Sequence, residues 1–269
     1  LDLKEQHAQI KDEIFEAFEK VYAKTAFSGG PFVQEFEENF AKFIGSTYAI
    51  GVSSGTTALH LSMLALEIGK GDEVIMPANT FIATPWGPSH AGATPVFVDC
   101  DAKTWQIDAS KIEDAITSKT KAIIGVHLYG QPFDIDAVKE ICDRHNLFLI
   151  EDAAQAHGAK DFSFYKKGKT AGSIGILGCF SFYPGKNLGA YGDGGAITTS
   201  SKKLYIKLLK LRNLGGIKKY EHDVVGFNSR LDTLQALILT RKLSELNKNN
   251  NNRKKIAKIY DQKINKKVK

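Results

Sequence analysis

The sequence predicts an α/β fold in which helices cover both faces of a mostly parallel central sheet. Over residues 48–152, short strand-like segments alternate with helical segments. The strand-like segments are apolar almost throughout, which is typical of strands buried on both faces. The chain has 269 residues, of which 43% are hydrophobic and 25% charged, as in an ordinary globular protein. This length and composition suit one large domain, or one domain and part of a second.

Five strands and three helices are predicted in this region, each following closely on the last. The predicted strands are YAIGVSS (48–54), DEVIMPANTF (72–81), TPVFVDCD (94–101), KAIIGVHLYG (121–130) and LFLIED (147–152). The predicted helices are GTTALHLSMLALEIG (55–69), IATPWGPSHAGA (82–93) and DIDAVKEICDRHN (134–146). Beyond them, we expect a further strand at the start of FSFYPGKNLGAYGDGGA (180–196), a long helix over 231–246 and one more helix in RKKIAKIYDQKI.

The domain boundaries are expected where the composition changes. A polar, helix-like segment covers 1–20, the main domain covers 21–246, and 247–269 is a basic tail rich in asparagine and lysine. The net charge of +6 resides in this end of the chain, because 241–269 holds 11 Lys or Arg and 2 Asp or Glu. Subtraction leaves 25 basic and 28 acidic residues in 1–240, so nucleic-acid binding is not indicated. The tail has the composition of a solvated, loosely ordered segment.

The sequence also indicates a cytoplasmic protein. No apolar run is long enough to span a bilayer, and the first residues lack the apolar core of a signal peptide. Three widely spaced cysteines, Cys100, Cys142 and Cys179, suit a reducing compartment. The phosphate loop, the dinucleotide-binding glycine pattern, the nucleophile elbow and metal-ligand Cys or His spacings are all absent. We therefore expect no metal site and no nucleotide hydrolase.

One lysine stands where a lysine is hard to solvate. Lys186 lies in an apolar stretch with four glycines among the residues just after it, and Asp152 ends a predicted strand. SSGTTALHL (53–61) places Gly55 and Thr56 where a strand gives way to a helix. Pyridoxal phosphate (PLP) needs a lysine amine for its aldehyde, a carboxylate for its pyridinium nitrogen and a helix N-terminus for its phosphate. Because sites in such sheets form at the carboxyl ends of strands, these residues are expected to meet.

Each of these residues also has a simpler interpretation. Taken alone, Lys186 would be a surface lysine, and Asp152 would cap a helix that begins at the next residue. Gly55 and Thr56 would be no more than a helix start. Histidines in apolar runs, here His127 and His157, are more often hydrogen-bonded structural residues than catalysts.

Six segments in order resemble the PLP-dependent sugar-nucleotide aminotransferases of the DegT/StrS type, and the resemblance covers nearly all of 1–245. They are LDLKEQH (1–7), SSGTTALHL (53–61), VHLYGQPFDIDAV (126–138), EDAAQAHGA (151–159), FSFYPGKNLGAYGDGGA (180–196) and GFNSRLDTLQALIL (226–239). The resemblance implies the large domain of an aspartate-aminotransferase-like PLP-dependent transferase. Family members continue well beyond the point matched by 247–269, so the tail is expected to begin an incomplete C-terminal small domain, and turnover by this chain is less secure than cofactor binding.

The resemblance also implies roles around the cofactor ring. Lys186 looks like the Schiff-base lysine, which explains a lysine among glycines, because an imine is not a stranded ammonium. Asp152 looks like the partner of the pyridinium nitrogen, and Gln155 like the side chain near the phenolic oxygen. Phe81 occupies the place of the aromatic residue that stacks on the ring, although by itself it reads as a core residue.

A second group is implied for the phosphate. Gly55, Thr56 and Ser181 look like its ligands within the chain. Asn228 matches an asparagine that family members lend to the neighbouring subunit's phosphate site, although it would otherwise read as a helix cap. A homodimer with shared active sites is therefore expected.

The activity implied is transamination between glutamate and a keto-sugar nucleotide, giving an amino sugar for surface polysaccharide or natural-product glycosylation. The FYPGKNLGAYGDGGA form of the lysine segment resembles members that act on 3-keto sugars, so a dTDP-3-keto-6-deoxyhexose is expected, with a 4-keto sugar as the alternative. A related sugar dehydratase is disfavoured, since such enzymes have histidine in place of Lys186. A non-catalytic or regulatory PLP-binding protein of the same fold remains open.

Overall fold

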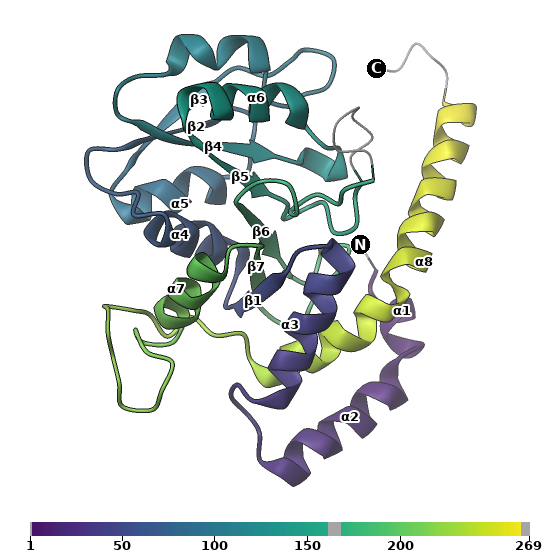
Figure 1. Ribbon diagram of the computed structural model, residues 1–269. Coiled ribbons are helices and arrows are strands. Elements are labelled where there is room, and N and C mark those ends of the chain that lie inside the picture. Colours follow the sequence, from purple (N-terminus) through teal and green to yellow (C-terminus); the bar gives the residue numbers. More distant parts are fainter. Residues whose placement is uncertain (1, 161–167, 265–269) are drawn as a thin grey trace.

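The computed structural model describes residues 2–160 and 168–264. Its centre is a seven-stranded sheet in the order β1-β7-β6-β5-β4-β2-β3 (Figure 1). The strands are β1 (Tyr48–Val52), β2 (Glu73–Pro77), β3 (Thr94–Val98), β4 (Thr120–Val126), β5 (Phe148–Asp152), β6 (Leu177–Ser181) and β7 (Gly195–Thr199). Parallel pairing joins β3, β2, β4, β5 and β6, whereas β7 runs antiparallel to both β6 and β1. The predicted mostly parallel α/β sheet is confirmed.

Helices cover both faces of this sheet. The described helices are α1 (Lys4–Ala8), α2 (Lys11–Lys24), α3 (Pro31–Ile44), α4 (Gly55–Ala65), α5 (Ala83–Ala91), α6 (Ile135–His145), α7 (Lys202–Arg212) and α8 (Thr233–Lys263). Short 3-10 turns occur at Ala109–Lys111, Glu113–Ala115 and Leu128–Gly130. Helices α4, α5 and α7 pack on one face, and α3 and α6 on the other, where α3 also contacts α8. None of these helices has the length and apolarity needed to cross a membrane.

The core is divided between the two faces because successive strand residues point in opposite directions. In β6, Cys179 packs with the α4 and α7 cluster, whereas its neighbour Phe180 packs with the α3 and α8 cluster. Phe180 meets Phe40 of α3 edge-to-face, with ring centroids 5.0 Å apart. Because both faces are covered, alternate residues are equally apolar, which is the pattern that the sequence shows.

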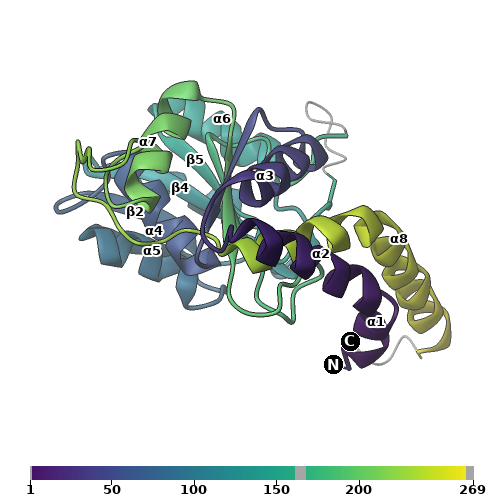
Figure 2. The same ribbon diagram turned by 90° about the horizontal axis from the view of Figure 1, so that it is seen from below.

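Helix α8 continues far beyond its predicted end. A helix was expected over 231–246, with a separate segment after the asparagines, but one helix runs from Thr233 to Lys263 (Figure 1). Its first half packs against α2 and α3, whereas 251–263 are exposed and stand away from the sheet (Figure 2). The packed half nucleates the helix. The stretch rich in asparagine and lysine that follows contains no glycine or proline, so the helix can continue through it.

A buried carboxylate in β5 connects the end of β4 with the segment that leads into β6. Glu151 accepts hydrogen bonds from His127 Nε2 at 2.9 Å and from the backbone N–H groups of Gly172, Ile174 and Gly175, each at 2.7 Å. Burial by itself raises the pKa of Glu151, but the hydrogen bonds from His127 and the backbone bring the pKa below its ordinary value. The carboxylate is therefore held in its charged form.

Replacing Glu151 with glutamine is expected to lower the free energy of unfolding by about 3–5 kcal/mol, because the new amide NH2 faces N–H donors and a buried partner is left unpaired. Denaturant unfolding would measure this, with the half-exposed Glu113→Gln as control, which should lose far less stability because its ion pairs are exposed to solvent. The lowered pKa of Glu151 gives a stabilisation that is present above about pH 4.5 and is lost as pH falls through the folded-state pKa, so the difference should shrink in acid. Equal losses for both variants would contradict this account.

Candidate active site

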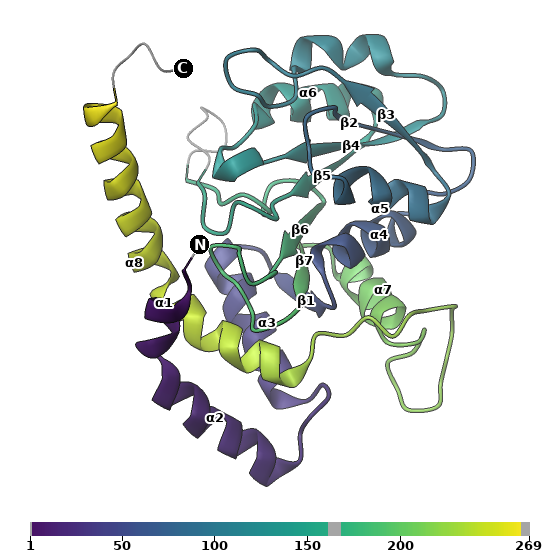
Figure 3. The same cartoon turned by 180° about the vertical axis from the view of Figure 1, so that it is seen from behind.

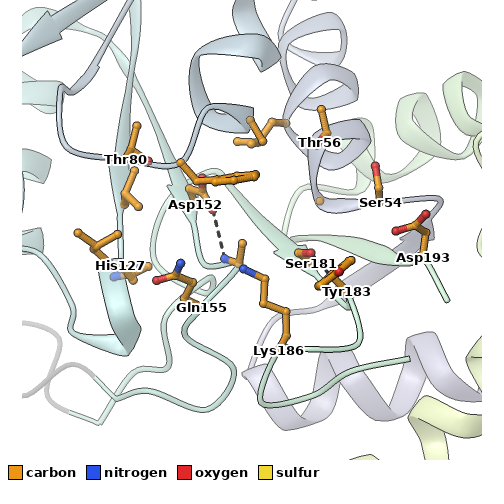
Figure 4. Close-up of a pocket in the computed structure, with 17 residues that line it drawn as sticks. Ser54, Thr56, Thr80, His127, Asp152, Gln155, Ser181, Tyr183, Lys186 and Asp193 are labelled. Atoms are coloured by element: carbon orange, nitrogen blue, oxygen red, sulfur yellow. Dashed lines mark hydrogen bonds between the residues drawn. The ribbon is translucent and has the colours of Figure 1, made fainter. Parts of the chain in front are cut away.

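The carboxyl ends of β1, β2, β4, β5 and β6 surround a cavity of about 460 Å³ (Figure 4). Of the eight residues predicted for the site, seven line this cavity: Gly55, Thr56, Phe81, Asp152, Gln155, Ser181 and Lys186. They come from loops and element ends that are up to 131 positions apart in the sequence (55 to 186). The site thus forms where the parallel strands of an open α/β sheet end.

Lys186 and Asp152 lie on facing sides of this cavity (Figure 4). Lys186 is half-buried in a tight turn, its N–H donating to the carbonyl of Tyr183 at 2.8 Å. Burial lowers the pKa of Lys186, while the charge of Asp152 acts in the opposite direction. Because its pKa is lowered, a larger fraction of the Lys186 amine is neutral at a given pH, and the neutral amine is the form that acts as a nucleophile or base.

Asp152 is a buried carboxylate aimed at the cavity. Its side chain accepts hydrogen bonds from Thr84 Oγ1 at 2.8 Å and from the N–H of Ala154 at 3.2 Å. Burial raises the pKa of Asp152, although the hydrogen bond from Thr84 and the charge of Lys186 oppose this. The helix-cap interpretation of Asp152 is wrong, because 153–158 form turns and not a helix. A buried carboxylate is stable when a cation meets it, and a protonated ring nitrogen is such a cation.

Thr84 is a site residue that the sequence analysis missed. It is fully buried in the first turn of α5, where its hydroxyl proton is given to Asp152. The hydroxyl of Thr80 lies 2.7 Å from that of Thr84 and must donate to it, since Thr84 has a single hydroxyl proton. The four-residue spacing of these threonines, directly after a strand, is the signal that could have identified them.

The N-terminus of α4 closes another side of the cavity. Ser54 caps the helix by accepting the N–H of Thr57 at 3.1 Å. In the described part of the chain, no side chain caps the N–H groups of Gly55 and Thr56, which the helix start leaves without intrahelical partners. A Cβ on Gly55 would lie 2.6 Å from Cβ of Ser181, so this glycine permits the close approach. A helix N-terminus beside serine and threonine hydroxyls is a site for a phosphate.

The remaining predicted residues lie as follows. Gln155 Oε1 accepts the N–H of Tyr129 at 2.6 Å, which fixes its side chain at the cavity wall. Phe81 is 67% exposed at the cavity rim, so the core interpretation is wrong. Asn228 is not among the residues lining this cavity, and its expected role in a neighbouring subunit stays a prediction. It does not cap α8 either, because Asp232 occupies the N-cap position.

His127 is a buried member of the cavity wall. Its Nε2 atom is bound to Glu151, and its ring stacks on Phe133 with centroids 4.7 Å apart. These contacts agree with the structural interpretation of this histidine. In residues 2–160 and 168–264, no cluster of three or more His, Cys, Asp or Glu side chains is arranged to hold a metal ion.

The residues of this cavity fit PLP. Lys186 would provide the amine, Asp152 the buried carboxylate for the ring nitrogen, and the start of α4 the phosphate cradle, each from a different strand end. The fold and this site define the class of PLP-dependent transferases with an aspartate-aminotransferase-like large domain. The chain belongs to the DegT/DnrJ/EryC1/StrS aminotransferase family, whose profile matches residues 8–268. Enzymes of this family use PLP.

Three relatives illustrate the similarity. The dTDP-3-amino-3,6-dideoxy-alpha-D-galactopyranose transaminase of Aneurinibacillus thermoaerophilus is 49% identical over 97% of this chain and 70% of its own length. The GDP-perosamine synthase of Escherichia coli O157:H7 is 43% identical over 88% of this chain and 64% of its own. The crystal structure of DesV from S. venezuelae, in complex with a ketimine intermediate, superposes with a TM-score of 0.88 at 44% identity, covering 92% of this chain and 65% of that one. The chain thus spans about two thirds of their length.

Proposed function

We propose that this chain binds PLP and supports transamination of a keto-sugar nucleotide, with glutamate as the amino donor. The observation that carries the proposal is the convergence of Lys186, Asp152 and the N-terminus of α4 on one cavity. When bound, PLP supplies an aldehyde that links to an amine and a ring that accepts the electrons released at the substrate carbon.

The chain's own groups then have distinct tasks. Lys186 would hold the cofactor through Nζ, and its amine, when free, would take the proton from the α-carbon of the donor. Asp152 would keep the ring nitrogen protonated, and Thr84 holds that carboxylate in place. Gly55, Thr56 and Ser181 would bind the phosphate, Gln155 would interact with the phenolic oxygen, and Phe81 would stack on the ring.

The proposed acceptor is a dTDP-3-keto-6-deoxyhexose. Support comes from the form of the lysine segment and from the Aneurinibacillus relative, a transaminase whose sugar is a 3-amino sugar on dTDP. A 4-keto sugar is the alternative to test, and the GDP-perosamine synthase relative makes GDP a second nucleotide to include. The protein would act in the cytoplasm, and the amino sugar would serve surface polysaccharide or natural-product glycosylation.

A homodimer with shared sites is part of the proposal. Phe81 and Tyr183, at 67% and 60% exposure, are large aromatic side chains at the cavity rim, which a second subunit would cover. Asn228 is proposed to reach the partner's phosphate. The oligomeric state measured by light scattering would test this, a monomer at micromolar concentration being the contrary result.

The function itself is tested by absorption spectroscopy and product analysis. Purified protein with PLP should show the visible band of a lysine-linked cofactor, and glutamate should convert that band while 2-oxoglutarate appears. A dTDP-3-keto sugar should then restore the band and yield an amino sugar detectable by mass spectrometry, in preference to a 4-keto sugar. Folded protein that shows no visible band with PLP would refute the proposal, and a stable band unmoved by glutamate would reduce it to cofactor binding.

A further inference from the structure

Helix α8 holds the loop that carries Lys186, here called the lysine loop and defined as residues 182–194. Gln235 Oε1 accepts the N–H of Tyr191 at 2.8 Å. Lys242 is buried and donates from Nζ to the carbonyl of Gly189 at 2.6 Å. These two side chains lie about two helical turns apart on one face of α8, and Asn250 lies about two turns further on the same face. Figure 3 shows the first half of α8 running beside α3 below the sheet.

Asn250 reaches the residue next to Lys186. Asn187 Nδ2 donates to Asn250 Oδ1 at 3.2 Å and to the carbonyl of His157 at 2.9 Å. Asn250 Nδ2 donates to the same carbonyl, also at 2.9 Å. The fourth contact joins His157 Nδ1 and Asn187 Oδ1 at 2.7 Å. Three residues from distant parts of the chain thus form a closed set of four hydrogen bonds.

The chemistry of the set has one consistent arrangement. The NH2 group of Asn187 faces two oxygens, so its Oδ1 must be the acceptor for His157 Nδ1. His157 can donate there as a neutral imidazole, because burial lowers its pKa to about 4. Every hydrogen bond has one donor and one acceptor, and the carbonyl of His157 receives two. His157 Nε2 takes no part in these bonds, but the four bonds restrain Asn187 from three sides.

Because Asn187 is the next residue in the chain, fixing its position also restricts the backbone of Lys186. The lysine loop is tightly folded, since a Cβ on Gly189 would lie 2.4 Å from the carbonyl oxygen of Pro184. Leu188, on the other side of Asn187, is fully buried. The backbone on both sides of Asn187 therefore moves only together with it.

We propose that Asn250 is a positioning residue for Lys186, which acts through Asn187 and His157 to hold the lysine loop against α8 with the amine facing Asp152. This inference rests on the proposed role of Lys186, but the hydrogen bonds that support it are all within the chain and do not involve the cofactor. It also assigns a task to one residue of a run, NKNNNN, whose composition indicates only a solvated tail.

The test measures the titration of Lys186 in protein free of cofactor. Trace labelling of amines with acetic anhydride over a pH series, with the Lys186 peptide quantified by mass spectrometry, gives the midpoint of its ionisation. In Asn250→Ala and Asn187→Ala, the loosened amine should gain solvent, and its midpoint should move up towards about 10.4, the value of an unperturbed lysine. Asn251→Ala, which changes the adjacent and exposed asparagine of the same helix, should leave the midpoint unchanged.

The double variant adds a second criterion. Asn187→Ala with Asn250→Ala should shift the midpoint no further than Asn187→Ala alone, because both act through one set of bonds. A folded Asn250→Ala protein with a wild-type Lys186 midpoint would overturn the proposal, even if its thermal stability fell. Should that variant not fold, Asn250→Ser is measured instead under the same criterion. Because no cofactor is present, failure to bind PLP would refute the proposed function and leave this result standing.

Discussion

Replacing Lys186 with alanine is expected to remove the visible band of lysine-linked PLP and to lower the transamination rate by at least about 10³-fold. General acid–base catalysis alone contributes roughly 10²–10⁴-fold, and the covalent linkage is lost as well. Among the described residues that line the cavity, Lys186 carries the one amine. Absorption spectra with PLP, before and after glutamate, measure the first effect, and single-turnover formation of 2-oxoglutarate measures the second.

Two further variants separate charge from chemistry. Lys186→Arg keeps the positive charge but cannot lose its proton, so it should be as inactive as alanine. Lys202→Ala removes an exposed lysine at the start of α7 and should behave like the wild type. A persistent lysine-linked band in Lys186→Ala would mean that another amine holds the cofactor.

Replacing Asp152 with asparagine is expected to weaken PLP binding by about 2–5 kcal/mol, because one partner of a buried charge pair is removed. This corresponds to a rise of roughly 30- to 5,000-fold in Kd, which cofactor titration followed by absorbance would measure. The rate on bound cofactor should fall too, since the ring nitrogen would no longer be held protonated. A variant that binds and turns over as the wild type would exclude Asp152 as the partner of the ring.

Thr84→Val tests the hydrogen bond that holds this carboxylate while leaving the carboxylate itself in place. It keeps the shape of the side chain but removes the O–H that donates to Asp152 Oδ2 at 2.8 Å. A hydrogen bond to a charged group contributes about 1.5–3 kcal/mol, so the variant should fall between wild type and Asp152→Asn. If Thr84→Val matched the wild type, the hydroxyl would have no part in holding the carboxylate.

The fold class was predictable because strands buried on both faces are apolar at every position. The segments ending at Val52, Pro77, Val126 and Asp152 therefore stood out, and the rule that sites form at the carboxyl ends of strands placed Asp152 and Gly55 correctly at the cavity. Lys186 stood out because a lysine among glycines and apolar residues is hard to solvate, but its role at the cofactor was implied only by the resemblance and stays a prediction.

Other features depend on contacts that no local pattern records. Strand β7 (Gly195–Thr199) was not anticipated. It lies between β1 and β6 and pairs antiparallel with both, and β1 is distant from it in the sequence. Thr84 looked like an ordinary helix residue, because its importance lies in the position of Asp152. The length of α8 was underestimated. The polar composition of its second half predicts exposure to solvent, but it does not predict where the helix ends.

The pairing of β1 with β7 has a consequence for the order of events during synthesis. Tyr48 is opposite Thr199, so the strand that leads into the start of α4 has no neighbour on this edge until the ribosome has added about 150 further residues (48 to 199). The strand that pairs with β1 therefore emerges long after β1 itself. Contacts so distant along the chain form slowly, and until then the exposed β1 edge is a place where two nascent chains can pair wrongly. A cofactor bound as proposed would stabilise only the completed sheet, because its site does not exist on the growing chain before Lys186 has been added.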